Sequence, residues 1–125
     1  AAAVAAFPLS VQAAFDAICG VLKAGATPAE IVAASSVIEA AGFTTCDDLV
    51  HGYGGGYFPP IVGSASRPAG PLPNMVLKAG MMVVVQPNVT SLDGKAGVQT
   101  GECVLITEDG CESIHDFPMG LRRTG

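Results

Sequence analysis

The residues best suited to chemistry lie together in one glycine-rich stretch near the middle of the chain. His51 begins the run HGYGGGYFPP, and two tyrosines, Tyr53 and Tyr57, follow it closely. Histidine changes charge near neutral pH, so it can accept a proton and return it during a reaction. A tyrosine hydroxyl can donate a hydrogen bond to a developing negative charge. Packing is the competing explanation for all three, because both residue types are also common structural residues.

Two helices are predicted ahead of this stretch, and they must help to position it. The first covers residues 10–24, where Ser10 can cap the start and apolar side chains recur at helical spacing: Val11, Phe15, Ile18 and Leu22. The second covers residues 28–41 and is preceded by a capping sequence, Thr27-Pro-Ala-Glu30. Gly42 stands where that helix ends.

The remainder of the chain predicts a long loop and a small sheet. Residues 51–73 are rich in glycine and proline, and ordered loops of this length often carry function. Strands are predicted at 81–89, 97–107 and 111–116, with a tight turn before the last of them. The first of these is almost continuously apolar, which predicts cover on both of its faces. Two helices followed by a small antiparallel sheet make an α+β fold.

Composition limits the classes of partner. Half of the residues are hydrophobic and only 14% are charged, which excludes disorder and suggests burial against a second subunit or the rest of a larger domain. An ordinary core rich in alanine and valine explains the same numbers equally well. The net charge is −5 and the basic residues are scattered, so no nucleic acid is expected as a partner.

Neither a membrane nor an oxidising compartment is indicated. The longest apolar run, Met81–Val85, is far too short to span a bilayer. The opening AAAVAAFPLS lacks the features of a signal peptide and is typical of a cut inside a longer protein. The four cysteines show no CxxC spacing, and we expect them to be reduced in a cytoplasmic protein.

Five short segments, in chain order, resemble motifs of one family. They are Lys23-Ala-Gly-Ala-Thr-Pro-Ala-Glu30, His51-Gly-Tyr-Gly54, Leu77-Lys-Ala-Gly-Met81, Gln86-Pro87 and the stretch 97–110. Together they resemble the C-terminal half of the pita-bread domain of creatinase, proline dipeptidase, aminopeptidase P and methionine aminopeptidase. The resemblance implies that residues 1–125 are that half, two helices on a small antiparallel sheet.

The same resemblance implies a metal site, which can be compared with this sequence. Members commonly bind two divalent metal ions through two Asp, one His and two Glu, and both Asp lie in the other half. In one alignment frame His51 is the metal-binding histidine, and Phe58 replaces a catalytic histidine. In the other frame His51 is an outer histidine, and Gly55 stands at the ligand position. The first frame is preferred because Pro60 fits the proline that follows.

Both glutamates of the family are replaced here. Gln86 stands at the first position and Gly101 at the second. Glu102 is next to Gly101, but neighbouring strand residues face opposite sides of a sheet, so Glu102 should point away. Without two carboxylates, a pair of divalent cations would stay unneutralised in a pocket of low dielectric. We therefore expect no dinuclear metal centre and no other cofactor.

Two functions from different classes remain. The first is a creatinase- or Xaa-Pro-peptidase-like hydrolase acting on C–N bonds of a small peptide or amidine without metal. His51 would then be its acid–base residue, and Tyr53, Tyr57 and Gln86 would bind substrate. The alternative is a non-catalytic relative that binds a peptide or small metabolite, with glycines 54–56 admitting a ligand close to the backbone. An ordinary metalloaminopeptidase is disfavoured by the lost carboxylates.

A half domain should also leave part of its surface uncovered. We expect an open sheet edge and a half-covered face, lined by Val83, Val85, Val104 and Ile106 or by their alternates. The chain would then be a homodimer or a portion of a longer folded chain. His51, Tyr53 and Gln86 would face the resulting seam.

Overall fold

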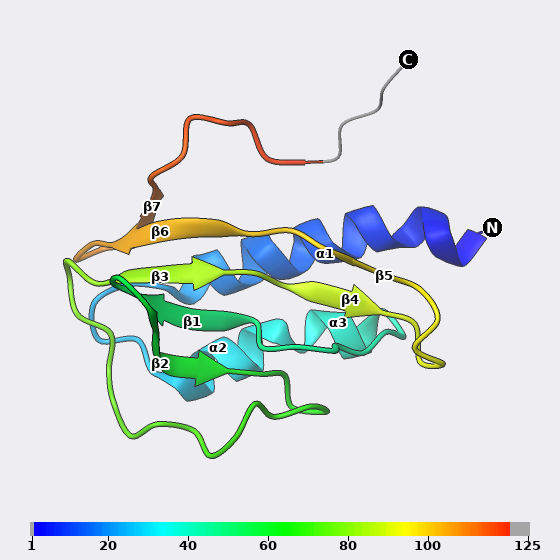
Figure 1. Cartoon of the computed structure of the whole chain (residues 1–125), viewed down its shortest axis with the longest axis horizontal. Coiled ribbons are helices and arrows are strands. Elements are labelled where there is room, and N and C mark those ends of the chain that lie inside the picture. Colours follow the sequence, from blue (N-terminus) through cyan, green and yellow to red (C-terminus); the bar gives the residue numbers. More distant parts are fainter. Residues whose placement is uncertain (1, 121–125) are drawn as a thin grey trace.

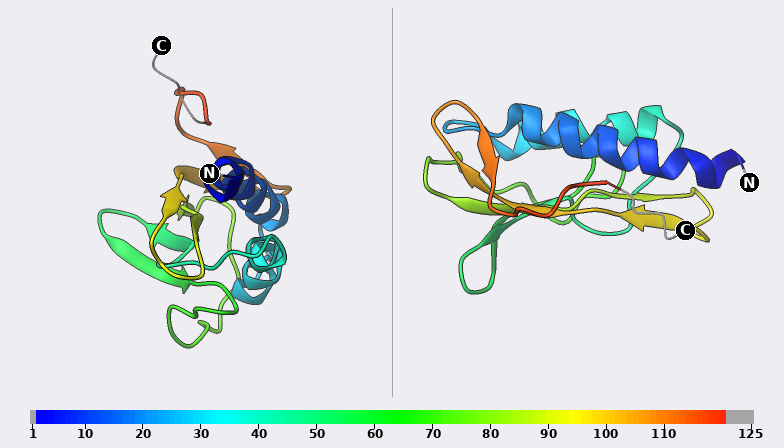
Figure 2. Two further views of the ribbon diagram at one scale, coloured as in Figure 1. Left: turned by 90° about the vertical axis from the view of Figure 1, so that its right-hand side faces the viewer. Right: turned by 90° about the horizontal axis from the view of Figure 1, so that it is seen from above.

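The fold has two layers, three helices lying on one face of an antiparallel sheet (Figures 1 and 2). The computed structural model describes residues 2–120. The helices are α1 (Ala2–Val21), α2 (Pro28–Ser35) and α3 (Val37–Ala40). The strands are β1 (Val50–Tyr53), β2 (Tyr57–Val62), β3 (Met82–Val85), β4 (Asn88–Thr90), β5 (Gly97–Gln99), β6 (Glu102–Ile106) and β7 (Cys111–Ser113). The predicted α+β class is confirmed.

The strands form two sheets that follow one another. The larger has the order β2-β1-β3-β6-β7, and every pairing in it is antiparallel. The smaller pairs β4 with β5. In Figure 1, β4 continues the line of β3, and β5 leads into β6, so the two sheets together make one long ribbon.

The first helix is displaced from its predicted bounds. α1 begins at Ala2 rather than at Ser10 and continues through Pro8 to Val21, short of the predicted end at residue 24. The alanine-rich start has high helix propensity, and Phe7 packs in the core, so the helix gains from continuing in that direction. Ser10 is therefore a residue within the helix and not its cap.

The start of the second helix is confirmed, but its length is not. Glu30 accepts a hydrogen bond from the Thr27 amide (2.7 Å), and the Thr27 hydroxyl accepts one from the Glu30 amide (3.4 Å), which completes the capping box. The predicted helix is interrupted at Ser36, which separates α2 from α3. The Ser35 hydroxyl donates to the carbonyl of Val32 (2.8 Å), a local bond that competes with regular helix geometry.

The predicted loop 51–73 is wrong in its first half, where β1 and β2 form a hairpin. The glycines between Tyr53 and Tyr57 make its turn, and Gly55 takes a positive φ of 85° that suits glycine. Aromatic and branched residues on both arms supply the strand propensity. A bulge between His51 and Gly52 shifts the register of this pair.

The predicted strands 81–89 and 97–107 are each interrupted. β3 and β4 are separated by Gln86-Pro87, and β5 and β6 by Thr100-Gly101. Pro87 has no amide hydrogen to give to a ladder, and Gly101 adds no packing surface. The turn before β7 forms as predicted, with the Thr107 amide donating to the Gly110 carbonyl (2.9 Å), but β7 ends at Ser113 rather than at 116.

The core lies between the sheet and the helices, so of the two predicted linings of the open face the structure has the second, the alternate residues. Four strand residues are fully buried in this core: Val83, Val85, Val104 and Ile106. The opposite face carries their alternates, among which Met82, Val84 and Leu105 stay partly exposed. The predicted cover on both faces of 81–89 is therefore wrong for β3, which is covered on one.

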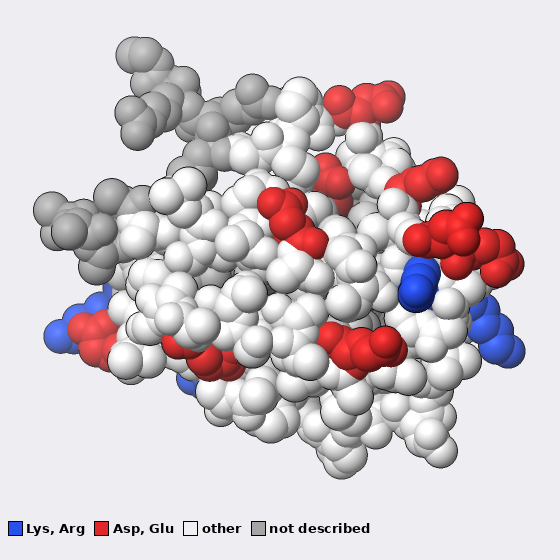
Figure 3. All heavy atoms as spheres, turned by 180° about the vertical axis from the view of Figure 1, so that it is seen from behind, with Lys and Arg blue, Asp and Glu red and all other residues white. Residues whose placement is uncertain are grey.

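The helical side carries little charge. Figure 3 shows it as a largely uncharged surface with scattered acidic side chains and few basic ones. Among residues 2–120, no helix is both long enough and apolar enough to cross a bilayer.

The bulge in β1 gives a first testable prediction. A Cβ on Gly52 would overlap the carbonyl oxygen of Pro59 and lie 2.9 Å from that of Phe58, and backbone atoms yield poorly. We expect Gly52→Ala to lower the free energy of unfolding by about 1–3 kcal/mol in chemical denaturation. Gly54→Ala is the matched control, because its Cβ meets only the Phe58 ring at 3.9 Å. Equal stability of the two variants would contradict this account of the bulge.

Candidate functional site

His51 lies on the open face of the sheet, covered by a tyrosine. Its register partners are Val84 on β3 and, one strand further, Cys103 on β6, so the three side chains form a row across that face. The Tyr57 ring stacks on the imidazole with 4.0 Å between ring centroids and an interplanar angle of 26°. His51 is consequently only 7% exposed.

The imidazole has one nitrogen in a defined contact. Nδ1 lies 3.0 Å from the carbonyl oxygen of Gly52. A proton on Nδ1 can be donated to that oxygen, and this tautomer leaves Nε2 with a free lone pair. A histidine held in this way can accept a proton at Nε2.

Asp48, which was not among the predicted site residues, joins them to one another. The Tyr57 hydroxyl donates to Oδ1 of Asp48, and Nε2 of Gln86 donates to Oδ2 at 3.2 Å. Burial raises the pKa of the Asp48 carboxyl, although the bond from Tyr57 acts in the opposite direction. Burial, followed by the bond to Asp48, raises the pKa of Tyr57. The Tyr57 hydroxyl thus bonds Asp48, whereas it was predicted to bind substrate.

A buried amide fixes the turn that carries Asp48. Asn88, at the start of β4, accepts hydrogen bonds at Oδ1 from the amides of Cys46 (2.7 Å) and Asp47 (3.1 Å). Its Nδ2 donates to the carbonyls of Asp47 (3.2 Å) and Asp48 (3.0 Å). Because the side chain is almost fully buried, these bonds determine where the turn can lie.

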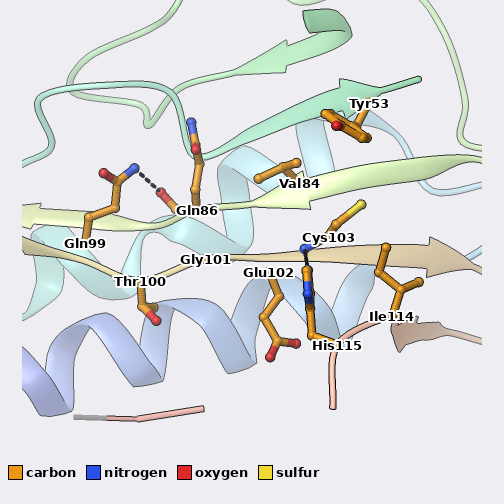
Figure 4. A pocket seen from close by; sticks show the side chains of 10 residues that line it. All are labelled: Tyr53, Val84, Gln86, Gln99, Thr100, Gly101, Glu102, Cys103, Ile114 and His115. Carbon is orange, nitrogen blue, oxygen red and sulfur yellow. Dashed lines mark hydrogen bonds between the residues drawn. The ribbon is translucent and has the colours of Figure 1, made fainter. Parts of the chain in front are cut away.

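A hollow of about 620 Å³ opens beside this network (Figure 4). It lies where the two sheets meet, and its lining residues are Tyr53, Val84, Gln86, Gln99, Thr100, Gly101, Glu102, Cys103, Ile114 and His115. The predicted residues Tyr53 and Gln86 are therefore brought to one place. His51 is not part of this lining and is joined to it through Tyr57 and Asp48.

The two positions of the family's glutamates are neighbours in space. A Cβ on Gly101 would lie 3.1 Å from Cβ of Gln86. Glu102 pairs with Val85, whose side chain is buried among the helices, and Figure 4 shows Glu102 and Cys103 leaving β6 in opposite directions. Glu102 therefore faces the helical layer, opposite to Cys103, as strand alternation predicts, although it is also among the residues that line the hollow.

A second histidine at the hollow was also missed. Nε2 of His115 accepts a hydrogen bond from the Cys103 amide at 3.2 Å, which holds the segment after β7 against β6. His115 was predicted to lie within the strand 111–116 and was assigned no role. An exposed polar segment directly after a short strand is only a weak indication of a functional residue. His115 could have been identified from the sequence only if β7 had been expected to end before it.

The donor set does not fit the dinuclear metal centre of the family. Gln86 directs its amide nitrogen to Asp48, Gly101 has no side chain, and the ring of His51 is covered. Over residues 2–120 there is no cluster of three or more His, Cys, Asp or Glu placed to hold a metal ion. A neutral amide is a poor replacement for a carboxylate on a hard divalent cation.

Comparison with known proteins places the chain in a family. Residues 9–108 match the model of metallopeptidase family M24, and the chain belongs to that family. Its fold is part of the pita-bread domain found in the structures described next. No curated protein sequence matches the chain significantly.

Solved structures show the same fold over nearly the whole chain. Dipeptidase PepE from Mycobacterium ulcerans is 25% identical over 97% of this chain and 32% of its own, with a TM-score of 0.77. The Xaa-Pro dipeptidase from Bacillus anthracis is 26% identical over 97% and 33%, also at 0.77. Methionine aminopeptidase from Rickettsia prowazekii is 20% identical over 90% and 52%, at 0.73. The chain spans about a third of the two dipeptidases.

The metal prediction can be checked by elemental analysis. Protein purified without chelator should carry well under one equivalent of Mn, Co, Fe or Zn, because two carboxylate positions are lost. His51→Ala is the matched control, since it removes the histidine of the family's ligand set. About one equivalent or more of metal, lost in His51→Ala, would show that the donor argument is wrong.

The clamp at Asn88 can be tested through stability. Asn88→Ala leaves two amides and two carbonyls of the turn without their partner, so we expect a loss of about 2–4 kcal/mol in the free energy of unfolding. Asn88→Asp keeps an acceptor but cannot donate, and it should also destabilise the protein. Gln99→Ala is the control, because Gln99 makes one long bond from an exposed position, 3.4 Å to the Gln86 carbonyl. A loss at Asn88 no larger than at Gln99 would contradict the clamp.

Proposed function

We propose that this chain is part of a hydrolase that cleaves a C–N bond in a small peptide or amidine without the dinuclear metal centre of its family. The observation that supports the proposal best is the connected set His51, Tyr57, Asp48 and Gln86 beside the hollow. It combines a proton carrier, a buried carboxylate and an oriented amide donor. Membership of family M24 supports peptidase-like chemistry in general.

His51 is the proton carrier in this proposal. With Nδ1 donating to the Gly52 carbonyl, Nε2 takes a proton from the attacking water and returns it to the leaving nitrogen. Tyr57 must turn aside for a substrate to reach Nε2. It can do so because it directly follows the glycine turn of the hairpin and is itself half exposed.

Gln86 and Tyr53 donate hydrogen bonds to the substrate carbonyl or to the equivalent group of an amidine. A primary amide carries two hydrogens, and the bond to Asp48 uses one, so Gln86 keeps a second donor. Tyr53 is 50% exposed and lines the same hollow. Two such donors stabilise negative charge on an oxygen during attack. Gly101 lines the same hollow and adds no side chain beside Gln86.

The opposite wall of the site belongs to a part of the protein outside these residues. In this proposal the chain is the C-terminal half of a pita-bread domain, and the open face with Tyr53 and Gln86 is the seam. The rest of a longer chain or a second copy of this one would cover it, in a protein of the cytoplasm. The partly exposed apolar residues of that face support such cover.

A second function, ligand binding without catalysis, is favoured by one observation. The stacked Tyr57 ring covers His51, and its hydroxyl bond to Asp48 holds it there. If that arrangement persists when a ligand is bound, His51 cannot exchange a proton with the ligand. Gln86 and Tyr53 would then bind a peptide or small metabolite that leaves unchanged.

Kinetics of the full-length protein distinguish the two functions. Xaa-Pro dipeptides and small amidines should be hydrolysed at a rate that chelator does not change. His51→Gln should lower kcat/KM by about 100-fold or more while ligand binding persists. Tyr57→Phe keeps the stacked ring but loses the bond to Asp48, and we expect a smaller loss. Leu92→Ala, an exposed position away from the site, is the control.

Each alternative result has a definite meaning. Binding that is lost in Gln86→Ala, with no turnover of any substrate, would favour the non-catalytic function. Turnover that chelator abolishes and added metal restores would overturn the metal-independent mechanism. Turnover that survives His51→Gln would remove His51 from its assigned role.

A further inference from the structure

Two cysteines that are 92 positions apart in the chain meet at the side of the molecule. The thiol of Cys111 lies 3.7 Å from the carbonyl oxygen of Cys19 and donates toward it. Cys19 belongs to the last turn of α1, and Cys111 begins β7. Both are partly buried, and both are free thiols.

The register of the sheet explains why the Cys111 thiol lies against the last turn of α1. Cys111 pairs with Ile106, whose side chain is buried in the core beneath the helices. Residues directly opposite each other on neighbouring strands project to the same face, so Cys111 points to the helical layer. Cys19 follows the fully buried Ile18 on α1, and both cysteines pack against the same core.

Backbone hydrogen bonds hold the two attachment points in place. Just after α1, the amide of Ala24 donates to the carbonyl of Thr107 at 2.9 Å. Thr107 in turn closes the tight turn that leads into β7, through the bond from its own amide to Gly110. The end of α1 and the start of β7 are thus held next to each other even when the two cysteines are reduced.

The two thiols differ in their readiness to ionise. A hydrogen bond from the Cys19 thiol lowers the pKa of Cys111 to about 7. The pKa of Cys19 is raised, first by that hydrogen bond, then by burial and by negative charges that include Asp16 and Glu102. Near neutral pH Cys111 is therefore the nucleophile, and Cys19 keeps its proton.

We propose that Cys19 and Cys111 form a redox pair that low-molecular-weight disulfides, such as oxidised glutathione, convert into an intramolecular disulfide. The Cys111 thiolate attacks one sulfur of oxidised glutathione, which forms a mixed disulfide and releases one glutathione thiolate. Cys19 then loses its proton and attacks the Cys111 sulfur, which releases the second glutathione. The protein gives up two electrons and two protons, and one oxidised glutathione becomes two reduced molecules.

The new bond would join helix α1 to the strand at the edge of the sheet. β7 is followed by Ile114 and His115, which line the hollow, so the clamp would also restrain that wall. Reduction would release it. This site is independent of the function proposed above, because none of its groups is used there.

The test uses the full-length protein and oxidised glutathione as the oxidant. After incubation at neutral pH, free thiols are blocked with an alkylating reagent and the protein is digested and analysed by mass spectrometry. We expect a disulfide-linked peptide pair containing Cys19 and Cys111, and a melting temperature roughly 10 °C higher that dithiothreitol reverses. Alkylation of Cys111 in the reduced protein should be half-maximal near pH 7.

Single variants supply the controls. In Cys19→Ser, glutathione should remain attached to Cys111, because no resolving thiol is present. Cys46→Ser should oxidise as the unchanged protein does, since Cys46 is an exposed cysteine outside the pair. Modification of Cys46 alone, or a digest of the unchanged protein without the linked pair, would overturn the proposal. The digest requires no variant, so it decides the matter even if a substitution impairs folding.

Discussion

The buried side chain of Asn88 is the constraint on which the candidate site depends. It comes from the small sheet and satisfies four backbone groups of the turn that carries Asp48. Buried amides and carbonyls without partners are costly, so the turn has no comparable alternative position. Asp48 is then placed to bond Tyr57 and Gln86, and Tyr57 is placed over His51. The interaction thus links both sheets to the site.

Local signals in the sequence predicted the parts of the fold that depend on local physics. The capping box joins Thr27 and Glu30, which are only three positions apart, and it formed as expected. The start of α1 did not, because packing of Phe7 against the core extends the helix past Pro8. The β1–β2 hairpin was also not predicted, because it too depends on contacts between distant residues. Glycine and proline in 51–73 indicate a loop, but only pairing with β3 shows that residues 50–53 are a strand.

The residues of the candidate site likewise include some that the sequence predicted and others that it did not. The family resemblance was enough to predict that Gln86 and Gly101 lie together, because it assigns both positions to one metal site. Asp48 was missed because its role arises from contacts with residues 9 and 38 positions away. One feature of the sequence does mark it: Asp47 and Asp48 are the only two acidic residues between Glu39 and Asp93. An isolated acidic pair just before a histidine merits attention when the usual ligands are missing.

The strands are interrupted at Gln86-Pro87 and at Thr100-Gly101, which separates the five-stranded sheet from the two-stranded sheet. The two sheets differ in local stability. The small sheet has only two strands, and a two-stranded ribbon is marginal without other support. It is held by Val89, which is buried in the core, by contacts with α1, and by the bonds of Asn88 and Thr90 to the segment 44–48. Its amide hydrogens can exchange with solvent through a local opening that breaks the Asn88 bonds and leaves the five-stranded sheet intact. One wall of the hollow and the turn that carries Asp48 would then loosen together, while the strand that carries His51 stays paired in the larger sheet.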